Sequence, residues 1–547
     1  MNYKFTELTR RRTKANSDYQ NNIKVDVISD NETFENKLFW RKSNISERSQ
    51  VLLKVLILCI SGNIAAFSMP GFNISALAWF GFIPLISTII LEKSLNKSLL
   101  YSFAFGFGFY AVTLIWLLSL HPLKWLGLGN IQSIILSTTV WLGISAYLSC
   151  YIVFFCLITR TFLCLNAGNI FKSILTALCW VIITNKLSSI GQFAFPWALV
   201  EYSQYKNLNL LQITQYIGGI GLGFLIIFFN CVLTFIFIDF IKKKQTAKNL
   251  ALNITYSLAF ILVFHLIGWI ILNNDGSFKS QFAATIIQNH STLENKSNER
   301  TNLKAIKNNY LTQIFDSPSG IIVLPEAAVY DFIRYKDRDF YKNLDKISRL
   351  HDKTIVIGAL DLVYNEDRKP VPTNAAIVLD KILPMQPENV YNKQILVPFG
   401  EYIPFRKYIP DFLNKFINNI SGTDFYPGKY TKVIKTSMGN IAPTICYEIV
   451  FPELIRKQVN DEAEILVNLS SLCWYHDSII KDQFVAFGVM RAAEFKRPCI
   501  IAVNTGNSVF IDFNGKIIKK LPKNKAITVT ARLNHNNEKT FYSKLFL

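Results

Sequence analysis

The stretch LQITQYIGGIGLGFLIIFFNCVLTFIFIDF, residues 211–240, is an almost uninterrupted apolar run. Its one charged residue, Asp239, stands at its end. A helix needs about 20 predominantly apolar residues to cross the hydrocarbon core of a bilayer. The stretch exceeds that length, so it predicts a transmembrane helix.

Six further apolar runs approach or exceed the length of a span. They lie at about 51–68, 74–91, 99–119, 133–156, 171–190 and 250–272. So many runs, placed so close together, leave too few amphipathic helices to cover them as the core of a soluble protein. The whole chain agrees with this interpretation, since it is 50% hydrophobic and only 18% charged. We predict a multi-pass α-helical membrane domain of about seven helices over residues 49–273.

The basic residues predict how this domain is oriented. Residues 1–48 are polar and basic, too long and too hydrophilic for a signal peptide, and are interpreted as a cytoplasmic arm. Lysine and arginine in short loops mark the cytoplasmic side. The loops on the side of the arm contain Lys93, Lys97, Arg160, Lys172 and the segment 242–248. The opposite loops hold little more than Lys124 and Lys206, so an odd number of spans places the rest of the chain outside.

The C-terminal half has a different pattern. Short β-branched runs such as GIIVLPE and ILVNLS alternate with helix-compatible stretches such as 330–350 and 478–497. Continuously apolar strands are typical of sheets that helices cover. We expect an extracytoplasmic α/β domain over residues 274–535 and a short C-terminal tail, residues 536–547. Nothing apolar after residue 530 reaches the length of a span, so the tail is expected outside as well.

The composition argues against a nucleic-acid-binding protein, a disulfide-stabilised protein and a metal-dependent protein. The formal charge of +20 could suggest a nucleic-acid partner, yet the basic residues form no face interleaved with aromatic residues. Five of the nine cysteines lie inside apolar runs, which leaves almost no material for a disulfide framework. The six histidines show no metal-binding spacing, so neither a metal nor another cofactor is expected.

Three motifs in the C-terminal half supply a base, a cation and a thiol that could act together in catalysis. IIVLPEAAV ends a strand at Glu326, YNKQILVPFGEYIP contains Lys393 and Glu401, and APTICYEIVF places Cys446 after an apolar strand. A thiol is only a few per cent ionised at neutral pH, so Cys446 needs a proton acceptor, and Glu326 can serve. The ammonium of Lys393 would stabilise an oxyanion, with the backbone N–H of Tyr447 as second donor.

At these three stretches the sequence resembles the nitrilase, or carbon–nitrogen hydrolase, superfamily. It is most similar to one membrane branch, the bacterial apolipoprotein N-acyltransferases, over roughly residues 50–545. The shared motifs include MPGFNISALAWFGFIPL, FGFGFYAVTLIWL, FAFPWALVEYSQ, GGIGLGFLI, LPEAAV, LVPFGEYIP, ICYEI, RAAEFKRP and NTGNS. The resemblance implies a four-layer αββα sandwich that carries a Glu-Lys-Cys triad.

The resemblance also implies a role for each site residue. Glu326 would be the general base, Lys393 the oxyanion stabiliser and Cys446 the acylated nucleophile. Glu401 and Glu448 would be supporting carboxylates near the nucleophile.

The implied reaction moves an acyl chain from a membrane phospholipid to the Cys446 thiol, and then to the N-terminal amine of a diacylglyceryl-modified apolipoprotein. The expected location is the bacterial inner membrane, with the arm cytoplasmic, the catalytic domain periplasmic and the protein a monomer. Four aromatic residues of the outer loops suit either lipid contact or ordinary interfacial anchoring. They are Trp125, Phe195, Trp197 and Tyr202.

Two other functions stay open from the residues alone. A membrane-tethered amidase of the nitrilase type would use the same triad to transfer acyl groups to water. A transporter or scaffold with a degenerate catalytic domain is disfavoured, because the triad is intact and the apolar runs lack the charged residues of a transport pathway. His265, the main polar residue within a run, is expected to face a neighbouring helix.

Overall fold

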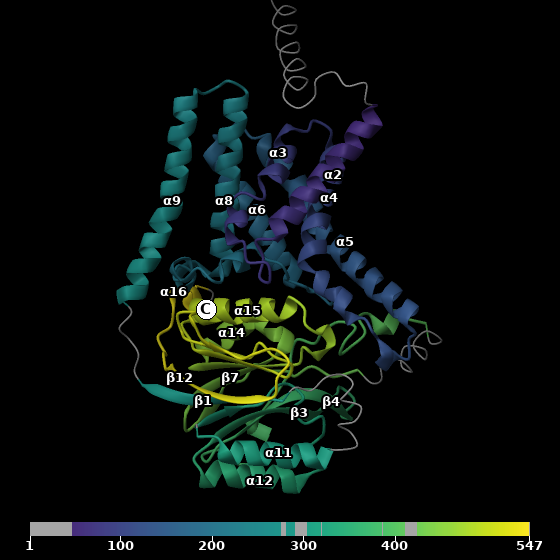
Figure 1. Ribbon diagram of the computed structural model, residues 1–547, viewed down its shortest axis with the longest axis vertical. Helices are drawn as coiled ribbons and strands as arrows, with labels where there is room; N and C mark the ends of the chain where they lie inside the picture. The colour runs from purple at the N-terminus through teal and green to yellow at the C-terminus, as the bar shows by residue number, and fades with distance from the viewer. Residues whose placement is uncertain are drawn as a thin grey trace, which may run out of the picture.

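The computed structural model describes residues 46–274, 280–289, 303–318, 320–385, 387–410 and 424–545. Almost all of the predicted basic arm, residues 1–48, lies outside these ranges. A bundle of helices forms one end of the molecule, and an α/β domain forms the other (Figure 1). Helix α9 leads from the bundle toward the first strand of the α/β domain.

Helical segments occupy all seven predicted runs. They are α2 (Glu47–Ala66), η1 (Ser75–Trp79) with α3 (Ile83–Leu91), α4 (Leu95–Thr113), α5 (Asn130–Leu163), α6 (Asn169–Val181), α8 (Thr214–Ile241) and α9 (Ala247–Asn274). Among the described residues, five helices are long and apolar enough to cross a membrane: α2, α5, α6 with its continuation to Ser189, α8 and α9. The predicted count of about seven membrane helices stays a prediction, since five helices meet this length and composition while all seven runs are helical.

The two runs that fall short have local causes. The run at 74–91 is a 3-10 turn followed by the nine-residue helix α3, because the chain turns at Phe80–Phe82 between them. Helix α4 has 19 residues, but its sequence LNKSLLYSFAFGFGFYAVT mixes lysine, serine and glycine with its aromatic residues.

Small and polar residues hold the helices of the bundle together. A Cβ placed on Gly62 of α2 would lie 2.1 Å from the carbonyl oxygen of Phe105 in α4, so only glycine permits this close approach. The amide of Asn230 in α8 donates to Ala78 and accepts from the backbone N–H of Phe82, which ties α8 to the short apolar helix. His265 lies 2.9 Å from the amide of Asn207 at the start of α7 (Leu208–Leu211), which agrees with its predicted orientation.

The α/β domain contains two six-stranded sheets. The first has the order β12-β1-β2-β3-β4-β5, and the second has the order β11-β10-β9-β8-β7-β6. The strands of the first are β12 (Ile527–Asn534), β1 (Gln281–Gln288), β2 (Ile321–Val323), β3 (Thr354–Tyr364), β4 (Pro370–Leu379) and β5 (Val390–Asn392). Those of the second are β11 (Ile517–Lys520), β10 (Val509–Ile511), β9 (Cys499–Val503), β8 (Ile465–Ser470), β7 (Gly439–Ile445) and β6 (Ile434–Thr436).

Successive side chains along each strand point to opposite faces of its sheet, so the two sheets pack against each other and against helices in four layers. Ile286 and Val323 of the first sheet share a core with Val467 of the second. Their neighbours Ile287 and Ile322 point the other way, toward α11 (Leu303–Asp316) and α12 (Arg338–Leu350). The outer face of the second sheet packs against α14 (Pro452–Asn460) and α15 (Ile480–Phe495). The predicted αββα sandwich is confirmed.

The layer of α14 and α15 lies against the membrane helices (Figure 1). Buried residues of α15, of the second sheet and of α8 belong to one continuous hydrophobic core. The short helix α16 (Phe541–Lys544) joins this boundary, since Tyr542 is buried against Gly218 of α8. The two domains are therefore packed together rather than joined by a linker alone.

Candidate active site

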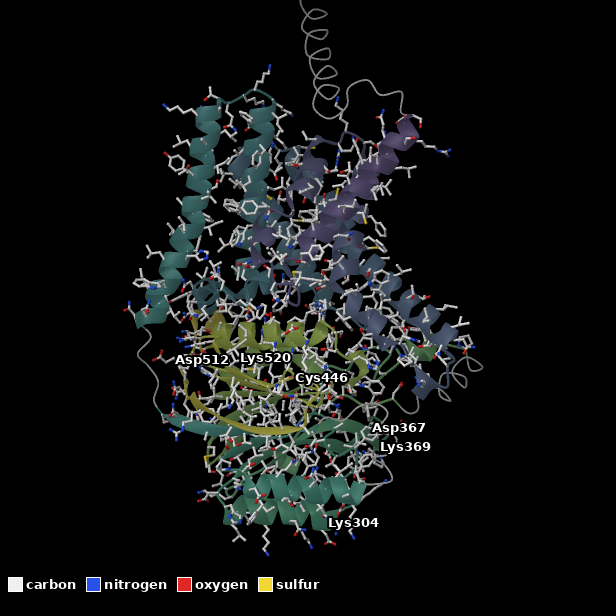
Figure 2. All side chains as sticks on the ribbon, in the orientation of Figure 1. Lys304, Asp367, Lys369, Cys446, Asp512 and Lys520 are labelled. Atoms are coloured by element: carbon white, nitrogen blue, oxygen red, sulfur yellow. The ribbon has the colours of Figure 1, made fainter. Side chains whose placement is uncertain are left out.

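The three predicted catalytic residues follow three different strands. Glu326 comes shortly after β2, Lys393 directly after β5 and Cys446 directly after β7. Because β2 and β5 belong to the first sheet and β7 to the second, the set spans the two sheets. In Figure 2, Cys446 lies closer to the membrane helices than Lys304 of the outermost helix layer does.

Cys446 adopts an uncommon backbone conformation. Its φ is +52°, in the left-handed region that non-glycine residues seldom occupy. The chain leaves β7 there and enters the 3-10 helix η9 (Cys446–Val450). Such strain is tolerated where surrounding contacts fix the backbone, and it is often found at functional sites. Here the side-chain amide of Asn468 helps to fix it, by donating to the carbonyl of Cys446.

Lys393 lies between two carboxylates. Its Nζ is 2.9 Å from Oε1 of Glu401 and 3.4 Å from Oε1 of Glu326. The side chain is only 1% exposed. Burial by itself lowers the pKa of Lys393, but the Glu401 and Glu326 carboxylates raise it above its ordinary value. The structure therefore holds a permanently charged ammonium inside the site.

The Cys446 thiol responds to the same charges. Burial and the negative charge of Glu326 raise its pKa above the ordinary value, whereas the Lys393 ammonium acts in the opposite direction. At neutral pH the thiol thus keeps its proton until a base removes it. The chemistry that these groups support is nucleophilic catalysis assisted by a carboxylate base and a fixed cation.

Asn374 is a site residue that the sequence analysis missed. It lies on β4, and its amide donates to Oε1 of Glu326 at 2.6 Å and to Oε1 of Glu401 at 3.2 Å. One amide group thereby holds both carboxylates beside Lys393. The sequence did contain one indication of this role. Asn374 begins the otherwise apolar stretch NAAIVL, and asparagine is seldom found at a buried position.

Glu448 connects the nucleophile turn to the lysine segment. Its fully buried carboxylate accepts hydrogen bonds from the backbone N–H groups of Ile445 (2.7 Å), Gln394 (2.6 Å) and Ile395 (3.1 Å). The hydroxyl of Tyr391 donates to it as well. Burial raises the pKa of Glu448 to about 7, although these N–H donors act to lower it. Its position indicates that Glu448 orients Cys446 and Lys393 relative to each other.

Tyr447 points away from the triad and toward the membrane helices. Its hydroxyl donates to the carbonyl of Ala194, and its ring stacks on Phe195 and Trp197. Its backbone N–H stands in the first turn of η9, where N–H groups have no partner within the helix. That N–H can therefore serve as the second oxyanion donor.

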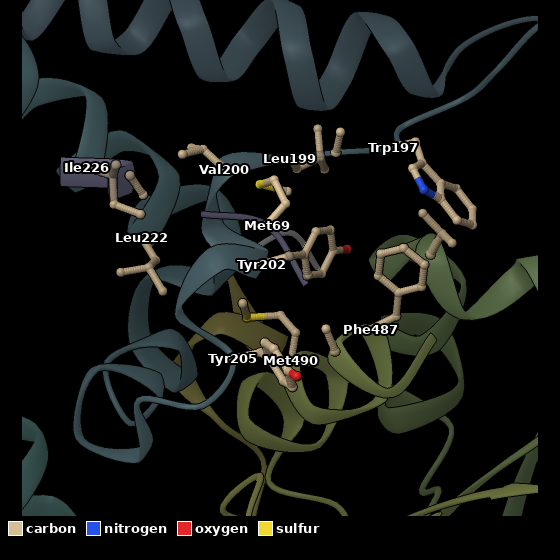
Figure 3. Close-up of a cluster of buried hydrophobic side chains, with 14 of the residues drawn as sticks. Met69, Trp197, Leu199, Val200, Tyr202, Tyr205, Leu222, Ile226, Phe487 and Met490 are labelled. Atoms are coloured by element: carbon tan, nitrogen blue, oxygen red, sulfur yellow. The ribbon is translucent and has the colours of Figure 1, made fainter. Parts of the chain in front are cut away.

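The predicted outer-loop aromatics are not exposed interfacial anchors. Trp197 is 3% and Tyr202 1% exposed, and both pack against Phe487 of α15 (Figure 3). Phe195 is half-buried and stacks on Trp197. The side chain of Trp125 lies outside the part of the chain that the structure describes. Phe195, Trp197 and Tyr202 were expected to contact lipid or to anchor at the interface, but they take part in the contact between the two domains, because the catalytic domain covers them.

Metal-ligating side chains do not gather in the described ranges. Across those residues, no group of three or more His, Cys, Asp and Glu side chains is arranged to hold a metal ion.

Comparison with known proteins finds the same two-part organisation. Residues 283–540 match the family described as carbon-nitrogen hydrolase, and residues 61–232 match the apolipoprotein N-acyltransferase N-terminal domain. An apolipoprotein N-acyltransferase of Haemophilus ducreyi is 27% identical over 504 residues, covering 90% of this chain and 92% of the relative. One of Geobacter metallireducens is 27% identical over 497 residues, covering 89% and 91%. A solved nitrilase-superfamily protein of Saccharomyces cerevisiae is 15% identical, covers 47% of this chain and 91% of its own, and has a TM-score of 0.34.

Proposed function

Because the chain belongs to the apolipoprotein N-acyltransferase family, we propose that it transfers an acyl chain from a membrane phospholipid, through a Cys446 thioester, to the N-terminal amine of a diacylglyceryl-modified apolipoprotein. The observation that carries this proposal is the buried contact of Lys393 with Glu326 and Glu401, which acts on the Cys446 thiol. This contact would supply a base and a cation to Cys446, which lies nearer the membrane helices than Lys304 of the outermost helix layer does (Figure 2).

In the first half-reaction Glu326 takes the proton of the Cys446 thiol, and the sulfur attacks the ester carbonyl of the phospholipid. The new oxyanion is stabilised by the Lys393 ammonium and the Tyr447 N–H. Collapse breaks the carbon–oxygen bond of the ester, and Glu326 returns its proton to the leaving oxygen. The products are a thioester on Cys446 and a lysophospholipid.

In the second half-reaction the amine of the lipoprotein attacks the thioester carbonyl, and Glu326 accepts a proton from the nitrogen. Lys393 and the Tyr447 N–H stabilise the second oxyanion as they did the first. Collapse breaks the carbon–sulfur bond, forms the amide and returns the proton to the thiol. Glu401 holds Lys393 in place throughout, and Asn374 keeps both carboxylates aligned.

Attachment to the membrane favours this reaction over one with soluble substrates. Both proposed substrates are anchored in lipid, so a site at the bilayer surface meets them at high local concentration and with a limited range of orientations. The hydrogen bond from Tyr447 to Ala194 links the nucleophile turn directly to the membrane domain.

The proposal is tested by supplying the purified protein with phospholipid and a synthetic diacylated lipopeptide. We expect triacylated lipopeptide and lysophospholipid in equal amounts, both quantified by mass spectrometry, and no ammonia from small amides. Ammonia release without acylation of the lipopeptide would instead identify an amidase that transfers acyl groups to water.

The protein is a membrane protein, and we propose that it resides in the bacterial inner membrane as a monomer, with its arm cytoplasmic and its catalytic domain periplasmic. Support comes from the basic residues of the loops on the side of the arm.

Labelling of the C-terminus tests this orientation. A cysteine-containing tag appended after Leu547 is expected to react with a membrane-impermeant maleimide once the outer envelope alone is opened. The untagged protein is the control, because Cys150 and Cys164 are exposed. A tag that reacts only after lysis of the inner membrane would contradict the proposed orientation.

A further inference from the structure

Helix α15 is buried on all sides between the second sheet and the membrane helices. Of its residues Ile480–Phe495, only Asp482 is not fully buried. Such burial is unusual for a helix of a catalytic domain, whose outer face would ordinarily be polar and solvated. Here the membrane domain covers that face, as Figure 1 shows.

Polar contacts hold α15 to the membrane domain near its first turn. The side chain of Gln483 accepts a hydrogen bond from Nε1 of Trp197 at 2.7 Å and donates to the carbonyl of Thr113, the last residue of α4, at 3.0 Å. This contact is neutral.

The contact near the last turn of α15 is charged. Oε1 of Glu494 accepts the backbone N–H of Gly219 in α8 at 2.6 Å, and its Oε2 lies 3.0 Å from Nε of Arg491. Arg491 also donates to the hydroxyl of Tyr202 at 3.3 Å. Arg491 and Glu494 are 2% and 1% exposed. Figure 3 shows Tyr202 and Met490 at this boundary.

The conformation of α8 exposes the N–H group that Glu494 binds. Gly218 has φ +68° and ψ 175°, which interrupts the helix, so Gly219 begins a new first turn with unpaired N–H groups. A carboxylate is favourable at such a position because the helix dipole is positive there. A Cβ on Gly219 would lie 2.9 Å from Oε1 of Glu494, so a larger residue there would displace the carboxylate.

A second buried carboxylate belongs to the same cluster. Glu201, from the 3-10 helix η6 (Val200–Gln204), is 2% exposed. Burial and, to a smaller extent, the charge of Glu494 raise the pKa of Glu201 to about 8, although Arg491 acts to lower it. This rise favours the neutral form of Glu201, so Glu494, 3.0 Å from Arg491, is the carboxylate that balances the Arg491 charge. A buried charge without a partner would strongly destabilise the fold.

We propose that Arg491 and Glu494 are positioning residues, which fix the catalytic domain on α8 so that the Cys446 thiol meets the ester of a membrane-held lipid. The inference rests on the proposed acyl transfer from phospholipid. Trp197 links α15 to the nucleophile turn, because it contacts Phe487 of α15 and also stacks on Tyr447, the residue after Cys446. A shift of α15 along α8 therefore moves the thiol relative to the bilayer.

The expected effect follows from the geometry of reaction. Reacting atoms must approach to roughly 3–3.5 Å, and a displacement of about 1 Å can cost about 100-fold in rate. A small soluble reagent reaches the thiol by diffusion wherever the catalytic domain lies relative to the bilayer. A phospholipid ester is held in the bilayer, so it reaches the thiol only when the domain is correctly placed. Loss of the hydrogen bond between Glu494 and Gly219 should therefore slow phospholipid acylation and leave the reactivity of the thiol toward soluble reagents unchanged.

The test compares Glu494→Ala with Glu494→Gln in the full-length protein, reconstituted in vesicles of phosphatidylethanolamine and phosphatidylglycerol. For Glu494→Ala we expect at least about 10-fold slower formation of the acyl-enzyme. Alkylation of Cys446 by iodoacetamide, followed on its peptide by mass spectrometry, should stay within about 2-fold of wild type. Glu494→Gln should recover most of the acylation rate, because its amide oxygen still accepts the Gly219 N–H and Glu201 can ionise to balance Arg491.

Lys186→Ala is the matched control. Lys186 pairs with Glu453 across the same boundary, but both side chains are about half exposed, and exposed ion pairs contribute little. We expect both rates to be unchanged in this variant.

Three results would overturn the inference: an unchanged acylation rate in Glu494→Ala, equal losses in acylation and alkylation, or no recovery in Glu494→Gln. A wild-type protein that takes no acyl group from phospholipid would instead overturn the proposed function itself.

Discussion

Replacement of Cys446 by alanine is expected to abolish the acyl-enzyme completely while the protein still inserts and folds. The thiol is the only group at this position that can form the thioester, and no other cysteine in the described ranges lies beside a Glu-Lys pair. Alanine has nearly the volume of cysteine without its sulfur, so packing around η9 should change little. The measurement is a hydroxylamine-sensitive acyl label from radiolabelled phospholipid.

Cys499→Ala is the matched control, because Cys499 is buried in β9 of the same sheet but lies outside the triad. It should become labelled like the wild type. A hydroxylamine-sensitive label that persists in Cys446→Ala would show that another residue is the nucleophile.

The second expected result concerns the two charged groups of the triad. Glu326→Gln removes the proton acceptor, and Lys393→Met removes the cation at the developing oxyanion. Each is expected to slow acyl-enzyme formation by about 100-fold or more, which is the usual cost of losing a catalytic base or an oxyanion donor. Lys393→Met also leaves Glu326 and Glu401 without their shared counterion, so its folded fraction must be measured beside its rate.

Lys307→Met separates catalysis from folding in this experiment. Lys307 is also buried and also binds two carboxylates, those of Asp331 at 2.8 Å and Asp337 at 2.7 Å. It lies on α11 in the layer farthest from the membrane helices. Its loss should lower stability without a specific loss of rate per folded molecule. Near-normal turnover in Glu326→Gln or Lys393→Met would mean that the triad has been assigned to the wrong residues.

Much of the architecture could be predicted because it depends on local pattern. The apolar runs located the helical segments, and the alternation of short strands with helical stretches predicted an α/β domain. The four-layer arrangement of that domain was implied only by the resemblance to the nitrilase superfamily. The count of spans was less secure. Hydropathy over a window does not register a turn such as Phe80–Phe82, which divides one run into two short helices.

The candidate site was predicted in part for a similar reason. Glu326, Lys393 and Cys446 each follow a strand, and the ends of strands in a sandwich lie close together in space. Asn374 was missed because it lies inside a strand, where a polar residue marks no boundary. The aromatic residues of the outer loops were assigned to lipid because nothing in their own sequence reveals that another domain covers them.

The sequence by itself determined where the apolar helices lie, which segments form strands and which residue types could perform the chemistry. These properties follow from the length, periodicity and side-chain chemistry of contiguous residues. Only the tertiary structure decided that Glu448 joins the Cys446 turn to the Lys393 segment, and that Glu494 of α15 binds Gly219 of α8, a residue 275 positions away. Such contacts depend on how whole elements pack, because a buried polar group is stable only where the fold supplies its partner.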